Sequence, residues 1–291
     1  MNPALQRKNN KISHQSLVID SFVWIFLLLA ALFILAPIIF MFTASLMPAN
    51  DILKMPYRWL PKGFYWQNYW QGIKGNDGSF IYIRNILNSI IVASVVSVTT
   101  VILSALAGFG LAKYYFKGRN VVFMLIMATM MIPFEAIMIP LYLVTTKLGI
   151  QDSYAGLIAP FLVNAFGVFL MRQYFITFPD EILDAARIDG ASELMIFRTI
   201  ILPNSIPAVA TLAILTFKAQ WDNLLWPLLV VQSEEMKTIP LYIVKFMAEK
   251  HTDEGAMMAV AAIASIPILI VFFKLSKYFL GGAALYSSRK G

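Results

Sequence analysis

The sequence predicts an all-α membrane protein with six transmembrane helices, and three observations support that prediction. The mean hydropathy is +0.71. Of the 291 residues, 59% are hydrophobic and only 13% are charged, about half the charged share of an ordinary soluble domain. Uncharged runs long enough to cross a bilayer as a helix recur along the chain and leave no room for a separate soluble domain. We therefore expect one transmembrane domain over residues 1–291.

Each expected helix coincides with one apolar run, and such runs fit helices rather than a closed barrel. The first run follows a polar tail, residues 1–20. It is too long for the core of a signal peptide, so we expect an uncleaved first helix. The third helix is expected to begin near Val121. The other five are expected within residues 21–46, 85–112, 153–171, 199–217 and 255–273.

The basic residues of the connecting segments predict the orientation, because cytoplasmic segments carry an excess of Lys and Arg. With six helices, both termini lie on one side. That side carries 13 Lys and Arg residues, and the opposite side carries 9. Lys113, Lys117 and Arg119 share one eight-residue loop on the richer side. We therefore expect both termini, the tail 1–20 and the loop 172–202 in the cytoplasm.

Charge and composition exclude several classes of function. The net charge of +7 is scattered in short clusters between apolar runs, a distribution that favours anionic membrane lipid over nucleic acid as a partner. The chain has no cysteine, which excludes disulfides and thiolate metal sites. Its two histidines, His14 and His251, lie far apart in the sequence. We therefore expect no catalytic site and no metal site.

The loop between the fourth and fifth helices is the most informative segment of the sequence. Pro179, Asp180 and Glu181 suit the first turn of a short helix, since proline needs no amide partner there and carboxylates favour the positive end of the helix dipole. Gly190 is a natural stop for that helix, and Ser192 can cap a second one. Small and acidic residues then form a knob that another protein can approach closely: Asp184, Ala185, Ala186, Asp189, Gly190 and Ala191.

These residues resemble the E-A-A loop of ABC importer permeases. The pattern E-A-A-x-x-D-G-A-x5-F-x-x-I-x-L-P-x3-P is matched over residues 184–207, with Phe197, Ile200, Pro203 and Pro207 in place. It departs from the pattern at the first position, where Asp184 replaces Glu. The stretch 217–228, with Trp221 and Trp226, is similar to permeases of the carbohydrate uptake transporter type 1 class, which includes the smaller maltose permease subunit.

The resemblance implies the type I ABC importer permease fold in a bacterial inner membrane, with a short coupling helix between helices four and five. The coupling helix would sit in a cleft of an ATPase subunit, with Asp184, Ala185, Ala186, Asp189, Gly190 and Ala191 at the contact. The implied partners are a homologous second permease, an ATPase dimer and an extracytoplasmic solute-binding protein. The chain has no G-x-x-x-x-G-K-[ST] motif, so we expect it to bind no cofactor, with ATP and Mg held by the ATPase subunits.

Polar residues near membrane depth are candidates for a substrate path, because burying them in lipid is costly. Glu135 is expected about 14 residues into the third helix, roughly 21 Å along it. Lys218 and Asp222 stand four residues apart and can pair, either in the path or as an ordinary ion pair at the interface. The other candidates for the path are Asn164, Gln220, Trp221 and Asn223.

The outer connections offer two further expectations. Residues 231–245 are expected to touch the solute-binding protein. The first outer loop is crowded with aromatic residues, which suit either the headgroup interface or the docking of an external partner. They are Tyr57, Trp59, Tyr65, Trp66, Tyr69 and Trp70.

Of three alternative functions, the sequence leaves a different cargo open, and it shows neither the features of a secondary transporter nor those of a membrane enzyme. The same architecture could carry a glycerol phosphodiester or a uronate oligosaccharide in place of a neutral sugar. An ion-coupled secondary transporter would need deep carboxylates beyond Glu135, together with an internal repeat. A membrane enzyme would need a polar cluster capable of acid, base or metal chemistry.

Overall fold

A computed structural model describes residues 14–75, 78–248 and 253–288, with side chains over 20–75, 78–244 and 253–278. The first 13 residues of the expected N-terminal tail, and His251, lie outside the described residues. All regular elements in the described part of the chain are helical.

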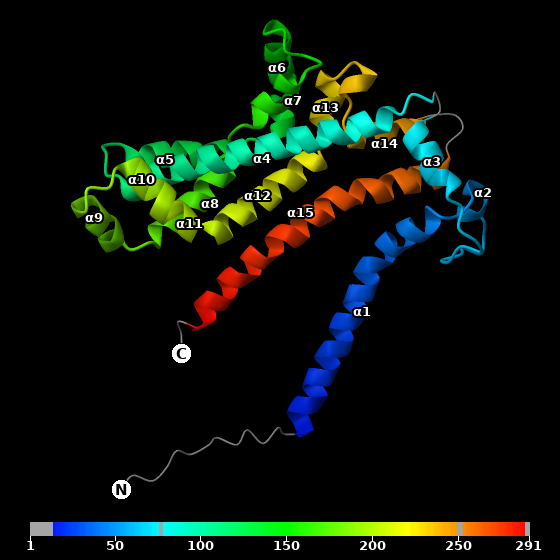
Figure 1. Cartoon of the computed structure of the whole chain (residues 1–291), viewed down its shortest axis with the longest axis horizontal. Coiled ribbons are helices and arrows are strands. Elements are labelled where there is room, and N and C mark those ends of the chain that lie inside the picture. The colour runs from blue at the N-terminus through cyan, green and yellow to red at the C-terminus, as the bar shows by residue number, and fades with distance from the viewer. Residues whose placement is uncertain (1–13, 76–77, 249–252, 289–291) are drawn as a thin grey trace.

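Three long helices dominate the structure (Figure 1). They are α1 (His14–Ala44), α4 (Ile81–Lys113) and α15 (Glu254–Ser288). Shorter helices lie between them in the sequence: α2 (Ala49–Ile52), α3 (Gln67–Lys74), α13 (Leu225–Val230), η3 (Glu234–Met236) and α14 (Ile239–Ala248).

The remaining helices form three bent pairs. The chain turns by 93° between α5 (Arg119–Thr129) and α6 (Phe134–Lys147). It turns by 45° between the unit made of α7 (Tyr154–Ile158) and η1 (Ala159–Phe161) and the helix α8 (Ala165–Ile176). The third bend, of 78°, separates α10 (Glu193–Ile196), η2 (Phe197–Ile201) and α11 (Leu202–Asn204) from α12 (Ile206–Trp221). The short helix α9 (Asp180–Ile188) precedes this last pair.

Length and composition allow three to six membrane spans among the described residues. Asp20–Ala44, Ile81–Lys113 and Glu254–Tyr278 are each long and apolar enough to cross a membrane. Each bent pair also qualifies if it counts as one span, which gives up to six.

The third, fourth and fifth expected helices are each bent in the structure. Pro133 is extended, with ψ 139°, and because it has no backbone N–H it cannot continue the hydrogen bonds of the preceding helix. Asn164 is likewise extended and caps α8, while the fifth helix bends near Ser205, between Pro203 and Pro207. The hydropathy profile does not reveal these breaks, because apolar residues continue across them. Glu135 consequently lies in the first turn of α6, and not about 14 residues along one continuous helix as expected.

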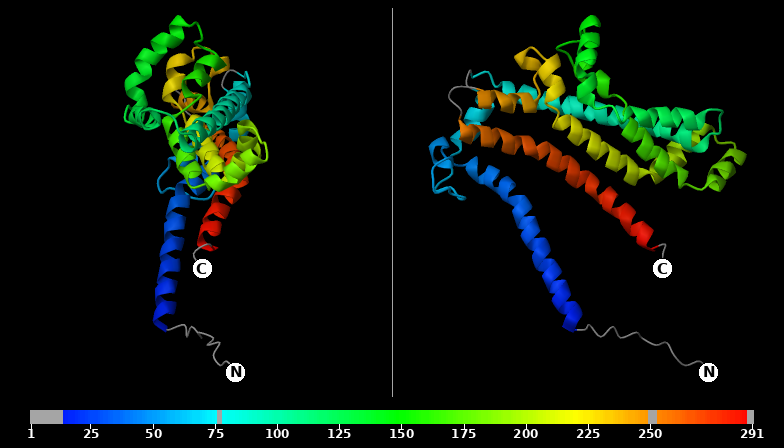
Figure 2. Two further views of the ribbon diagram at one scale, coloured as in Figure 1. Left: turned by 90° about the vertical axis from the view of Figure 1, so that its left-hand side faces the viewer. Right: turned by 180° about the vertical axis from the view of Figure 1, so that it is seen from behind.

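The helix α4 forms the centre of the fold and packs against α8 and α12, while α12 also packs against α15. Gly108 makes the first of these contacts possible, since a Cβ there would lie 2.8 Å from the backbone nitrogen of Arg172. By contrast, the first half of α1 stands away from the other helices (Figure 2). One end of α4 lies beside α9 and α10, and the other lies near α3 and α14 (Figure 1).

Candidate coupling site

The helix α9 presents most of the predicted knob to solvent. Pro179 stands at its N-cap rather than inside the first turn, with Asp180 and Glu181 following it. Gly190 ends the helix with φ +82°, a conformation that side chains with a Cβ rarely adopt. The only buried residue of α9 is Leu183. Of the six predicted coupling residues, Asp184, Ala185, Asp189 and Gly190 are exposed, while Ala186 and Ala191 are half-buried.

Ile188 is a further candidate contact that the motif does not mark. Its side chain is 86% exposed at the end of α9, and Ile182 on the same helix is also exposed. Two isoleucines on a short solvent-facing helix suit a surface that another protein covers. The sequence pattern begins at residue 184, after Ile182, and leaves Ile188 at an unspecified position.

Buried side chains fix the knob to the transmembrane helices. Leu183 of α9 and Ile196 of α10 join one cluster with Phe109 of α4, Phe175 of α8 and Leu212 of α12. Ser192 caps α10 as expected, because its hydroxyl accepts a hydrogen bond from the amide of Met195 at 3.3 Å. A movement of α9 therefore reaches α4, α8 and α12 through packed side chains.

Ion pairs join the two short helices of the loop to each other. Arg187 donates to Glu193 Oε1 and to Asp184 Oδ1, each at 2.8 Å. Glu193, and to a lesser degree Asp184, raise the pKa of Arg187, so it stays charged. The phenol of Tyr114, at the end of α4, donates to Glu193 Oε2 at 2.6 Å. Burial and this hydrogen bond raise the pKa of Tyr114 to about 12, so the hydroxyl remains a donor at neutral pH.

Lys113 makes a second connection between α4 and this loop. Its amine donates to the carboxylate of Asp180 and to the backbone carbonyl of Phe178. Only 4% of the lysine side chain is exposed, against 60% of the aspartate. The sequence marks Lys113 only as an indicator of orientation, because its partners lie more than 60 positions away.

The predicted path residues divide into two groups. Near the end of α12, the Asn223 amide donates weakly to Gln220 at 3.4 Å, and Trp221 stacks on Phe217 with ring centroids 5.7 Å apart. Trp221 also lines a cavity of about 440 Å³ between α12, α14 and α15. Among the described residues, no hydrogen bond links Glu135 or Asn164 to this group. Asn164 instead caps α8, accepting from the Gly167 amide at 2.6 Å.

The predicted pairing of Lys218 with Asp222 is confirmed, at 2.8 Å. Both side chains are more than half exposed. The pair therefore behaves as a surface ion pair, which contributes little to stability.

The loop that follows α13, residues 231–238, is held to the rest of the structure by hydrogen bonds. Asn88 of α4 is fully buried, and its amide donates to the carbonyls of Glu235 at 2.7 Å and Lys237 at 2.9 Å. Ser89 accepts from the Ile239 amide at 2.8 Å. Asp152 accepts from the amide of Gln232 at 2.9 Å.

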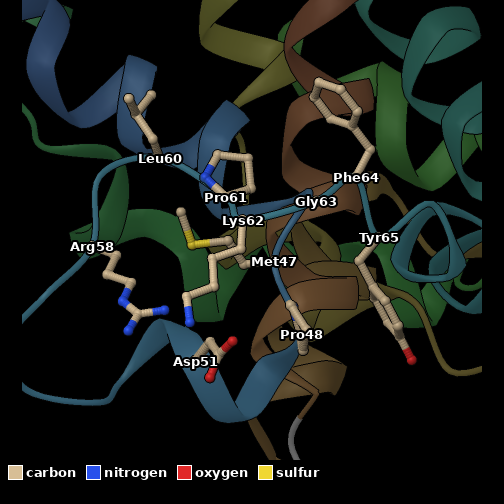
Figure 3. A pocket seen from close by; sticks show the side chains of 10 residues that line it. All are labelled: Met47, Pro48, Asp51, Arg58, Leu60, Pro61, Lys62, Gly63, Phe64 and Tyr65. Atoms are coloured by element: carbon tan, nitrogen blue, oxygen red, sulfur yellow. The ribbon is translucent and has the colours of Figure 1, made fainter.

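The first outer loop folds back toward α1. Trp59 packs edge-on against Phe40 of α1, with centroids 5.6 Å apart. Next to it lies a cavity of about 310 Å³. Figure 3 shows Arg58, Lys62 and Asp51 among the side chains that line it. Tyr57, Trp59, Trp66 and Trp70 of this loop are each more than half exposed.

Comparison with known proteins connects these features. Residues 100–280 match the family described as "Binding-protein-dependent transport system inner membrane component". The chain belongs to this family. It is thus a membrane permease of a binding-protein-dependent importer, and the matched residues include both α9 and the loop after α13.

Relatives in this importer family align along nearly the whole chain. The arabinooligosaccharides transport system permease protein AraQ of Bacillus subtilis (strain 168) is 36% identical over 260 residues, which cover 89% of this chain and 92% of that protein. The sn-glycerol-3-phosphate transport system permease protein UgpE of Brucella abortus (strain 2308) is 33% identical, with 88% and 93% covered.

A solved importer also shares the fold. The crystal structure of a bacterial ABC transporter involved in the import of the acidic polysaccharide alginate contains a chain that matches with a TM-score of 0.80 and 26% identity. The match covers 92% of this chain and 98% of that chain. The all-helical importer permease architecture predicted from the sequence is thereby confirmed.

Proposed function

We propose that this permease imports a sugar or oligosaccharide, driven by ATP hydrolysis on separate ATPase subunits. The observation that carries the proposal is the similarity over 89% of the chain to a permease for arabinooligosaccharides. When ATP binds, the two ATPase subunits close together and push on α9. The transmembrane helices then tilt, so that the substrate path opens to the outside. ATP and Mg stay on the ATPase subunits, and this chain binds no cofactor and catalyses no reaction.

The proposed assembly contains this chain, a homologous second permease, two ATPase subunits and an extracytoplasmic solute-binding protein. Each bent pair counts as one span, which gives six spans with both termini in the cytoplasm of a bacterial cell and α9 on the same side. Asp184, Ala185, Ala186, Asp189, Gly190 and Ala191 meet the ATPase. Residues 231–245, on the opposite side, meet the solute-binding protein through the loop 231–238 and the start of α14.

The chemistry of the cavity beside Trp221 favours a neutral sugar over a phosphate or uronate. Its lining combines an indole, aliphatic side chains, the hydroxyl of Ser265 and one carboxylate, Asp222, without Lys or Arg. An indole can stack on the apolar face of a sugar ring, whereas phosphates and carboxylates call for Arg or Lys. The relatives that carry sn-glycerol-3-phosphate keep a phosphorylated polyol as the second candidate.

Membrane lipid is the other proposed partner. The contact of Trp59 with Phe40 brings the first outer loop back to the level of α1, where aromatic residues rest in the headgroup region. Arg58 and Lys62 in the neighbouring cavity suit a lipid phosphate there.

Uptake of labelled substrates tests the cargo. Cells that depend on this chain should take up a labelled neutral oligosaccharide, and unlabelled glycerol 3-phosphate should not compete. Trp221→Ala should raise the half-saturation concentration, because the stacking surface is lost, while Trp221→Phe should retain part of it. The control is Trp66→Ala, on the exposed outer loop. Competition by glycerol 3-phosphate, with no effect at Trp221, would favour the phosphorylated cargo.

A further inference from the structure

The helix α4 is the unbroken connection between the two ends of the molecule. It runs for 33 residues without an internal proline, which corresponds to about 50 Å. The three bent pairs turn by 93°, 45° and 78° along the way. A displacement is transmitted along a continuous helix, whereas a bend can absorb it.

Polar contacts attach the cytoplasmic end of α4 to both sides of the coupling helix. Lys113 holds the residues where α9 begins, through Asp180 and the carbonyl of Phe178. Tyr114 holds the residues that follow α9, through Glu193, which in turn binds Arg187. We call these contacts of Lys113 and Tyr114 the inner clamp.

A second group of polar contacts attaches the other end of α4 to the outer loop. Asn88 binds the carbonyls of Glu235 and Lys237, and its own carbonyl oxygen accepts from Tyr154 at 2.6 Å. Ser89 binds the Ile239 amide. Both side chains are buried. We call these contacts of Asn88 and Ser89 the outer clamp.

Close packing keeps the stretch between the clamps rigid. Val96, Ala93, Thr100 and Ser104 of α4 are buried, and Thr100 donates to the carbonyl of Phe161 at 3.0 Å. A densely packed helix of this kind shifts as a body rather than deforming.

We propose that Lys113, Tyr114 and Asn88 are positioning residues that make α4 a rod, so that movement of the coupling helix repositions the outer loop at residues 231–238. This inference rests on the proposed function, because it requires that α9 binds the ATPase subunit. The position of the outer loop therefore depends on whether nucleotide is bound to the ATPase, because α4 transmits the displacement. None of the three residues belongs to the 184–207 motif.

The absence of natural cysteines makes the rod directly testable. Gln232→Cys places a single thiol on the exposed outer loop, where the native side chain is exposed and only the backbone amide bonds to Asp152. The assembled transporter, purified from its native membrane, is labelled with a membrane-impermeant maleimide, with and without a non-hydrolysable ATP analogue. The labelling rate is read on the band of this chain.

The nucleotide is expected to change the labelling rate by about fivefold or more, the usual range of coupling between distant sites. In the Lys113→Met/Tyr114→Phe background, this change should disappear while ATP hydrolysis persists. The matched control is Lys117→Met/Tyr115→Phe, which removes the same groups from the same loop. Lys117 is exposed, and 84% of Tyr115 is exposed. The control should keep the full change.

Asn88→Ser probes the other clamp and should abolish the same change. A nucleotide effect that survives in the inner-clamp background, or is missing in the unmodified background, would overturn the rod. A complex that contains no ATPase would instead overturn the proposed function, and the rod with it.

Discussion

One carboxylate oxygen of Asp152 accepts two hydrogen bonds from Ser233, at 3.0 Å from its amide and 3.1 Å from its hydroxyl, although the residues lie 81 positions apart. Burial tends to raise the pKa of Asp152, but the hydrogen bonds from Gln232 and Ser233 outweigh burial and hold the pKa below its usual range. The ionised carboxylate therefore ties the loop at residues 231–238 to the turn before α7.

The tether between Asp152 and the outer loop predicts a pH dependence. A lowered pKa in the folded state means that its stabilisation is fully present above about pH 4, the pKa of a free aspartate. It is lost as the pH falls through the lower pKa of the folded protein. Asp152→Ala should cost about 1 kcal/mol at pH 7, measured by thermal unfolding, and less at pH 3. A difference that grows toward low pH would contradict the tether.

Ile188 predicts separate effects on stability and on assembly. Ile188→Ser should leave the stability of this chain within about 0.5 kcal/mol, because an exposed residue makes few internal contacts. It should lower the affinity for the ATPase subunit roughly tenfold or more if the Ile188 side chain becomes buried in that contact. Retention of the ATPase after dilution measures this. Met131→Ser, at a residue that is 84% exposed and distant in sequence from α9, is the control.

Gly108 predicts a packing defect between α4 and α8. A Cβ in Gly108→Ala would lie 2.9 Å from Met171 Cβ and 2.8 Å from the Arg172 nitrogen, so the helices must separate. The expected cost is about 1–3 kcal/mol, seen as a lower unfolding temperature in detergent. Gly110→Ala, two residues further along α4, meets no atom within 4 Å and should be neutral or stabilising. Equal behaviour of the two variants would refute the close approach.

Asn164 predicts a structural defect with little effect on apparent affinity. Asn164→Ala removes the cap of α8 and should cost about 1 kcal/mol, while Asn164→Asp should restore the cap. The half-saturation concentration for uptake should stay unchanged in both variants. An increase in both variants, at normal expression, would instead place Asn164 in the path.

The sequence predicts the helical class, the coupling loop and its caps, because each depends on neighbours within a few positions. Pro179, Gly190 and Ser192 act on the backbone beside them, so their roles follow from residue type. The same reasoning correctly paired Lys218 with Asp222, one helical turn apart.

Contacts between distant segments could not be predicted from the sequence. Tyr114 and Glu193 are 79 positions apart, and Asn88 and Glu235 are 147 apart. Nothing local distinguishes these polar residues from others at the ends of apolar runs. The break before Glu135 was missed for a related reason, since its apolar flanks give a continuous hydropathy signal.

Co-purification tests the central claim most directly, namely that α9 binds an ATPase subunit. The tagged wild-type chain, the Gly190→Asp variant and the control Gly118→Asp are each purified from the native membrane in mild detergent. Both glycines have positive φ and no atom near a new Cβ, so the two variants strain the backbone alike. The account predicts that an ATPase and a second permease accompany the wild type and Gly118→Asp, and that Gly190→Asp loses the ATPase. A chain that purifies alone, or an ATPase equally retained by Gly190→Asp, would contradict it.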